Sequence, residues 1–152
     1  METCPICQGT LVESKAVFEC EKCKRKWRQC DEGWETIPMA VNVDFSKLEE
    51  FKQNVDEFYK HNPLIHIIVN NSGGPKGGEI LNAAEDEFRN AISSHLYCSH
   101  YLVQKFVPGM KSESFGRIIN IISTSVKQPI PGLGVSNTTR WAMAAWSKTL
   151  SL

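Results

Sequence analysis

Apolar residues follow two alternating patterns from Met39 onward, and these patterns predict strands and helices in turn. Short, nearly continuous apolar runs are typical of strands buried in a parallel sheet, and they occupy residues 39–44, 64–69 and 116–122. Elsewhere apolar residues recur at the three- to four-residue spacing of a helix face, over about 46–61, from about Ala84 to Pro108-Gly109, and from Ser136 to the last residue. Alternating strands and helices predict an α/β fold with a parallel sheet.

The distribution of cysteines sets the beginning of the chain apart from the rest. Five of the six cysteines fall within the first 30 residues, and only Cys98 lies beyond them. This change in composition predicts a small module at 1–33, a linker at 34–38 and an α/β domain at 39–152. A module of about 33 residues buries little apolar surface, so a bound metal would supply most of its folding free energy.

The first module contains two Cys-x2-Cys pairs, Cys4/Cys7 and Cys20/Cys23. Four thiolates at this spacing complete the tetrahedral shell of a structural zinc ion. The pattern resembles a zinc ribbon. An iron site of the rubredoxin type and a tail of free thiols remain as alternatives, and Cys30 has no partner of matching spacing.

Basic residues surround Trp27 in the same module, at Lys22, Lys24, Arg25, Lys26 and Arg28. A basic cluster with an aromatic residue can bind nucleic acid through phosphate pairing and base stacking. Five acidic residues nearby dilute this charge, so the sequence favours a solvated ribbon tip over a nucleic-acid site.

Charge balance and hydropathy limit the partners and the cellular compartment that the sequence predicts. The 152 residues include 17 basic and 17 acidic side chains, so no net charge draws the protein to nucleic acid or to a membrane surface. No apolar run approaches the roughly 20 residues that cross a bilayer, and no secretory leader precedes the first cysteine. A cytoplasmic protein with reduced or metal-bound cysteines is the expectation.

Three motifs in the α/β segment occur in a characteristic order. Asn70-Asn71-Ser72-Gly73 follows one predicted strand, Ser123 ends the next, and Ser136 and Arg140 stand 13 and 17 residues further on. This order resembles the short-chain dehydrogenase/reductase family, over 39–152. The family has Asn-Asn-Ala-Gly after its fourth strand, a serine at the end of its fifth, and a Tyr-x3-Lys pair in the helix that follows.

The resemblance implies an incomplete Rossmann-like, three-layer parallel fold and NAD(P)-dependent oxidation or reduction of an alcohol or carbonyl. By position, the catalytic serine is Ser123, while the tyrosine, lysine and asparagine positions are held by Ser136, Arg140 and His95. The cofactor positions implied by the family are Asp44, Asn70, Asn71, Ser72 and Gly73. A serine hydroxyl is a far weaker acid than a phenol, and a guanidinium stays charged, so impaired or absent catalysis is expected. Tyr97 or Tyr101 is a candidate replacement acid.

The chain has no glycine-rich turn of the kind that holds a dinucleotide pyrophosphate after the first strand of such a sheet. The family's first two strands have no counterpart, and its last strands lie beyond Leu152. In the strand order 3-2-1-4-5-6, this leaves a gap beside the strand at 64–69. We expect the strand at 39–44 to pair directly across the gap, and the alternatives are a strand supplied by the zinc ribbon, or a homodimer or helper chain that completes the sheet. The alternative to an oxidoreductase is a non-catalytic zinc-binding adaptor or a nucleic-acid-contacting protein.

Overall fold

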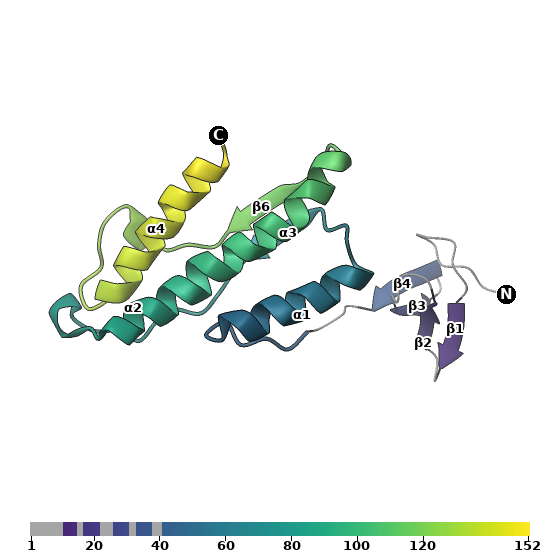
Figure 1. Cartoon of the computed structure of the whole chain (residues 1–152), viewed down its shortest axis with the longest axis horizontal. Coiled ribbons are helices and arrows are strands. Elements are labelled where there is room, and N and C mark those ends of the chain that lie inside the picture. The colour runs from purple at the N-terminus through teal and green to yellow at the C-terminus, as the bar shows by residue number, and fades with distance from the viewer. Residues whose placement is uncertain (1–10, 15–16, 22–25, 31–32, 38–40) are drawn as a thin grey trace. The chain divides into compact units, whose positions relative to one another are not determined.

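The computed structural model describes residues 11–14, 17–21, 26–30, 33–37 and 41–152 (Figure 1). The chain divides into two compact units. The first contains residues 1–42 together with Lys60–Asn62, and the second contains Val43–Tyr59 and Pro63–Leu152.

The first unit contains an antiparallel meander of four strands, β1 (Leu11–Ser14), β2 (Val17–Cys20), β3 (Lys26–Cys30) and β4 (Gly33–Ile37), which lie side by side in chain order. Cys20 is the last residue of β2, and Cys30 lies opposite Gly33 where β3 turns into β4. The predicted linker at 34–38 therefore contains a strand, since β4 pairs with β3 along its whole length.

The second sheet has two parallel strands, β5 (Ile67–Asn70) and β6 (Arg117–Asn120), paired in register from Ile67–Arg117 to Asn70–Asn120. The helices are α1 (Leu48–His61), α2 (Glu85–Ile92), α3 (Cys98–Ser112) and α4 (Gly134–Leu150), and a π-helical turn (Ser93–Tyr97) joins α2 to α3. Short 3₁₀ turns occupy Ile80–Asn82 and Thr124–Val126.

The predicted strand at 39–44 is wrong for the residues described, because 41–44 have no strand structure. Within the described residues β5 pairs with β6 alone, so residues 41–44 do not pair with β5 as predicted. A strand requires a hydrogen-bonding neighbour, which local apolar content cannot supply.

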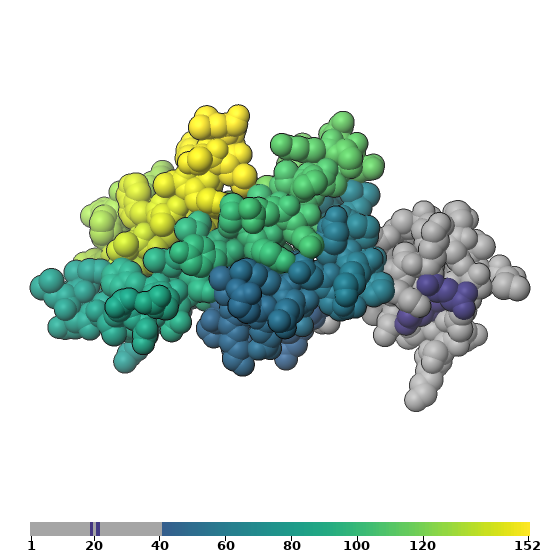
Figure 2. All heavy atoms as spheres, viewed as in Figure 1, coloured from purple at the N-terminus to yellow at the C-terminus, as the bar shows by residue number. Residues whose placement is uncertain are grey.

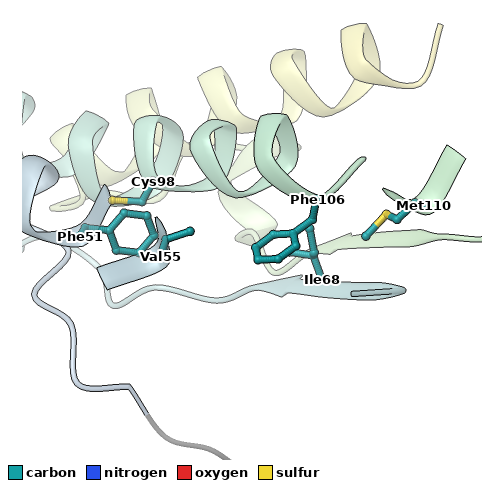
Figure 3. Close-up of a cluster of buried hydrophobic side chains, with 6 residues drawn as sticks. All are labelled: Phe51, Val55, Ile68, Cys98, Phe106 and Met110. Atoms are coloured by element: carbon teal, nitrogen blue, oxygen red, sulfur yellow. The ribbon is translucent and has the colours of Figure 1, made fainter. Parts of the chain in front are cut away.

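The core of the second unit lies between α1, α3 and one face of β5. Its buried members are Phe51, Val55, Ile68, Cys98, Phe106 and Met110. Figure 3 shows Phe106 of α3 beside Ile68 of β5, and Phe51 of α1 beside Cys98. Phe106 also meets the rings of Phe58 and Tyr59, so atoms of α1 lie directly against α3 (Figure 2).

The other face of the same two strands is open. Ile68 and Asn70 are 6% and 8% exposed, whereas Ile67 and Val69, which point the opposite way, are 53% and 56% exposed. On β6, Ile119 is 46% exposed. The described second unit therefore has two layers rather than the three predicted, since helices cover only one face of its sheet.

The helix predicted to end at Pro108-Gly109 continues to Ser112. Proline removes one backbone donor, and the surrounding turns of α3 tolerate this loss. The helix ends where Ser114 adopts a left-handed conformation (φ 53°), and the Phe115 N–H returns to the Met110 carbonyl at 3.0 Å. This is the left-handed backbone that commonly closes helices.

Candidate functional site

Polar side chains connect β5, β6 and α4 at the carboxyl end of the small sheet. The Asn70 amide donates to Asn120 Oδ1 at 2.7 Å, and the Asn120 amide donates to Ser147 Oγ at 2.9 Å. The Ser147 hydroxyl donates in turn to the Met143 carbonyl at 2.7 Å. Asn70 thus has a structural role, because it fixes the end of β5 to β6.

The loop after β5 is tied to the π-helical turn by a Ser–His pair. Ser72 Oγ and His95 Nδ1 share a hydrogen bond of 2.7 Å. His95 is 2% exposed, and its Nε2 atom has no partner among the described residues. Burial, reinforced by the nearby Arg140 charge, lowers the pKa of His95 to about 4. The imidazole is therefore neutral at physiological pH, and π-helical turns of this kind are frequent at functional sites.

Arg140, in the second turn of α4, holds the two post-strand loops together. Its Nη1 donates to the Ile121 carbonyl at 3.1 Å, just beyond β6, and its Nη2 donates to the Ser72 carbonyl at 3.3 Å, just beyond β5. Its Nε is buried without a partner in the described structure. Burial lowers the pKa of Arg140. Both terminal nitrogens bind neutral backbone oxygens, which limits their availability to a cofactor.

These groups surround one enclosed pocket of about 70 Å³. Five predicted site residues line it: Asn70, Asn71, Ser72, His95 and Arg140. A second, more open pocket of about 260 Å³ borders it through His95 and is lined by Gly73, Gly74 and Lys76 among others. The predicted loop, the helix position and the arginine position therefore do meet at one place.

Ser123 and Ser136 are not among the residues that line either pocket. Ser123 is half-buried, and its hydroxyl accepts the Ser125 N–H at 3.0 Å at the start of a 3₁₀ turn. Ser136 is half-buried in the first turn of α4, and its carbonyl accepts the Thr139 hydroxyl at 3.3 Å. Their catalytic assignment remains a prediction.

Asp44 is exposed and lies just before α1. Its Oδ1 accepts both the backbone N–H and the hydroxyl of Ser46, at 2.9 and 2.7 Å. These hydrogen bonds, the hydroxyl first, lower the pKa of Asp44. The carboxylate thus stabilises the chain reversal before α1, and its adenine-binding role is also untested.

Neither candidate replacement acid lies in the pocket. The Tyr101 hydroxyl donates to Asp56 at 2.6 Å, and burial followed by this hydrogen bond raises the pKa of Tyr101 to about 12. Lys105 also pairs with Asp56, at 2.6 Å. Tyr97 is 51% exposed. A phenol with a raised pKa is a poor proton donor at neutral pH.

Ser94, Ser99 and Met143 also line the pocket and were not predicted as site residues. Ser99 follows His95 by four positions, and its hydroxyl donates to the His95 carbonyl at 2.7 Å. The helical spacing of these two residues was the available signal. Met143 had no comparable signal, because it reaches the pocket only through the packing of α4.

Three of the four proposed zinc ligands, Cys4, Cys7 and Cys23, lie outside the described residues, and Cys20 is described by its backbone alone. Within the described ranges, no group of three or more His, Cys, Asp or Glu side chains is placed to hold a metal ion.

Among the helices of the described residues, none has the length and apolar character needed to cross a membrane.

A family model described as short chain dehydrogenase matches residues 7–152. The chain belongs to this family. It is 29% identical over 115 residues to a 4-formylbenzenesulfonate dehydrogenase of Comamonas testosteroni, covering 75% of this chain and 46% of that protein. A 3-oxoacyl-[acyl-carrier-protein] reductase of Staphylococcus epidermidis is 26% identical over 141 residues, covering 93% of this chain and 54% of that protein.

Solved structures support the same fold. L-sorbose reductase from Gluconobacter frateurii, in complex with NADPH and L-sorbose, superposes with a TM-score of 0.66 at 28% identity, over 72% of this chain and 42% of that one. The α/β segment therefore has the Rossmann-like architecture of the family. The chain spans about half the length of the curated relatives it matches.

Proposed function

We propose that the chain carries the central part of an NAD(P)-dependent oxidoreductase domain for an alcohol or carbonyl substrate, and that its chemistry is impaired when these 152 residues act alone. One observation carries the proposal. Ser72, His95 and Arg140 converge on one pocket at the carboxyl ends of β5 and β6, where open α/β sheets bind their ligands.

Two features support the impairment. The positions that the family resemblance assigns to a tyrosine and a lysine hold Ser136 and Arg140, and the Arg140 guanidinium donates to two backbone carbonyls. By the family resemblance, Ser123 of this chain would orient the substrate carbonyl. Asp44 and the loop 70–73 would contact a nicotinamide cofactor. The bound cofactor would supply hydride transfer.

The first test is calorimetric titration of the full chain with NADPH and NADH. The proposal predicts no binding tighter than about 100 μM, since a glycine-rich pyrophosphate turn has no counterpart in the chain. Micromolar binding by a folded sample would contradict the impairment.

A double variant tests whether catalysis is limited by the replaced tyrosine and lysine or by the absence of a glycine-rich pyrophosphate turn. Ser136→Tyr combined with Arg140→Lys restores the family pair, and Thr138→Tyr combined with Arg117→Lys is a control with matched chemistry elsewhere. If the pair alone limits catalysis, carbonyl-dependent NADPH oxidation rises only in the first variant. The proposal predicts no rise in either, because cofactor binding is also impaired.

Completion of the sheet belongs to the same proposal. The open face of β5 and β6 presents Ile67, Val69 and Ile119, each about half exposed, and parallel sheets normally have both faces covered. We expect a helper chain or a second copy to cover it. Sedimentation of the full chain should show self-association that Val69→Lys weakens and Leu81→Lys, an exposed control outside the sheet, leaves unchanged. A strictly monomeric protein would exclude the second copy.

A structural zinc ion in the first unit is the second candidate, and a zinc-binding adaptor is the function it favours. The specific observation is that Cys20 is the last residue of β2, and that β3, which pairs with β2, begins at Lys26. Metal analysis should find one zinc per chain, lost in Cys20→Ser and kept in Cys30→Ser. Absence of zinc from freshly purified, reduced protein would remove this candidate.

A further inference from the structure

The two loops that follow β5 and β6 are joined by a short parallel backbone contact. The Gly78 N–H donates to the Gly132 carbonyl at 2.7 Å, and the Gly134 N–H donates to the Gly78 carbonyl at 3.1 Å. The loops pack so closely that a Cβ atom on Gly134 would lie 2.7 Å from the Ile80 Cα atom. Figure 1 shows the loop before α2 beside the start of α4, where this contact lies. The contact therefore fixes two segments that are far apart in the sequence.

A cavity of about 600 Å³ lies at this contact, within the size range of small-molecule sites. Its lining combines both loops with the first turns of α4. Apolar side chains from these three segments line it, namely Ile80, Ile130 and Trp141. All three are exposed, so their apolar surface is accessible to a ligand. The cavity shares no lining residue with the two pockets near His95.

Hydrogen bonds within the protein fix the walls of this cavity. The Asn137 amide donates to the Ile130 carbonyl at 2.9 Å and accepts the Ile130 N–H at 3.3 Å. Trp141 Nε1 donates to the Ser125 carbonyl at 2.9 Å, which holds the indole ring. The Thr138 hydroxyl donates to a backbone carbonyl one turn earlier in α4, at 3.1 Å. These side-chain donors already have acceptors, so apolar contact and charge remain as the means of recognising a ligand.

Glu79 supplies the charge of the cavity. It is exposed, and its carboxylate has no hydrogen bond or ion pair with other described residues. Within the described part of the chain, no lysine, arginine or histidine lines the cavity. The cavity thus offers one negative charge and the exposed indole ring of Trp141. A cation is attracted by both groups, by the carboxylate through charge and by the ring through a cation–π interaction.

We propose that this cavity binds an organic cation, a small molecule with an apolar body and a single ammonium group. The apolar body covers Ile80 and Ile130, and the ammonium group lies against the Trp141 ring with Glu79 as its counter-ion. The carboxylate disfavours an organic anion, and a hydrated inorganic cation lacks the apolar surface that fills the cavity. This binding goes beyond the oxidoreductase proposal, because it needs neither a nicotinamide cofactor nor Arg140.

The experiment titrates the full chain, without cofactor, with three probes that share a benzyl group and differ in charge. They are benzyltrimethylammonium, benzyl alcohol and phenylacetate, at equal ionic strength and neutral pH. Nitrogen-15 NMR follows the indole N–H of Trp141, which is assigned by its absence in Trp141→Leu. The cation should shift this resonance saturably with a Kd of about 1 mM, as expected for a ligand of its size. Benzyl alcohol should bind about threefold more weakly, and phenylacetate about tenfold more weakly.

Matched variants locate the effect. Glu79→Gln should weaken cation binding about threefold and leave benzyl alcohol binding unchanged, whereas Glu113→Gln, at an exposed glutamate outside the cavity, should alter neither. Trp141→Leu keeps an apolar wall but removes the ring, so it should weaken cation binding about fivefold. Trp146→Leu, at a ring that contacts His100, should not. Saturation-transfer NMR on the ligand measures both leucine variants, and the two glutamate variants decide if Trp141→Leu does not fold.

Three results would overturn the proposal. The first is equal affinity for the cation and for phenylacetate, which would mean that the cavity selects apolar surface alone. The second is unchanged cation binding in Glu79→Gln. The third is cation affinity that falls as the protein concentration rises, which would show that a second copy of the chain covers the cavity. Because NADPH is absent, these outcomes are independent of the oxidoreductase proposal.

Discussion

Both faces of the β5–β6 sheet carry aliphatic side chains, but the two faces lie in different environments. Ile68 on one face contacts the core formed by α1 and α3, whereas Ile67, its neighbour in the same strand, is more than half exposed. The polar groups Asn70 and Asn120 also lie on the covered side, and they link the strands to α4. The covered side thus contains the core and the asparagine pair, and the described second unit depends on this side for its stability.

The largest difference between the two faces is expected when either of the adjacent residues Ile67 and Ile68 is replaced by alanine. Ile68→Ala should lower the free energy of unfolding by about 2–4 kcal/mol, because it leaves a cavity beneath Phe106. In protein dilute enough to be monomeric, Ile67→Ala should cost at most about 1 kcal/mol, because its side chain is already half hydrated. Urea unfolding followed by circular dichroism measures both. Similar costs for the two variants would mean that a partner covers the open face.

The buried His95 should make the stability of the protein depend on pH, because burial lowers its pKa. Its pKa in the folded state is about 4, below the usual value of 6.5, so between these pH values the unfolded state binds one more proton. Stability should therefore be constant above about pH 7 and fall by about 2–3 kcal/mol as the pH drops through 6.5 towards 4.

The His95→Gln variant should remove this part of the pH dependence, and His100→Gln should retain it. Denaturant midpoints at pH 7, 5.5 and 4.5 provide the measurement. An unchanged pH profile in His95→Gln would show that the imidazole is not the group responsible.

Loss of the Asn70–Asn120–Ser147 hydrogen bonds should lower the free energy of unfolding by an intermediate amount. Asn120→Ala removes the acceptor of the buried Asn70 amide and the donor to Ser147, and an unsatisfied buried amide costs about 1–2 kcal/mol. Asn90→Ala, at an exposed position on α2, should be neutral. Chemical unfolding compares the two variants, and equal stability would exclude a structural role for the link.

The smallest effect is expected for polar substitution of the open face. In protein dilute enough to be monomeric, Val69→Thr should change the free energy of unfolding by less than about 0.5 kcal/mol, because Thr keeps the β-branched shape and the site is 56% exposed. Thermal unfolding at two protein concentrations measures it. A larger loss that grows with concentration would indicate that this face is buried in an assembly.

The sequence predicted much of this local structure. The apolar runs predicted β5 and β6, and the helical spacing predicted a helix over about 46–61, which α1 confirms. The order of the Asn-Asn-Ser-Gly loop and Arg140 predicted a family that the comparison confirms. These features depend on residues close in the chain, so local pattern suffices to predict them.

Other features depended on partners that the local pattern cannot specify. Residues 41–44 have the apolar character of a strand, but no neighbouring strand pairs with them, so they remain irregular. Pro108 predicted a helix end, yet packing of Phe106 and Met110 on either side of it keeps α3 helical. Ser123 and Ser136 have the spacing of a catalytic pair, but neither lines the pocket that the other predicted residues share.

The sequence by itself determined the order of the strands and helices, the position of the loop after β5 and the residue types available for chemistry, because these follow from short-range spacing. Only the tertiary structure decided which face of the sheet is covered, that His95 binds Ser72, and that the Arg140 terminal nitrogens bind two backbone carbonyls. The physical reason is distance along the chain. Arg140 lies 68 residues from Ser72, and such a contact forms only when the intervening elements have packed.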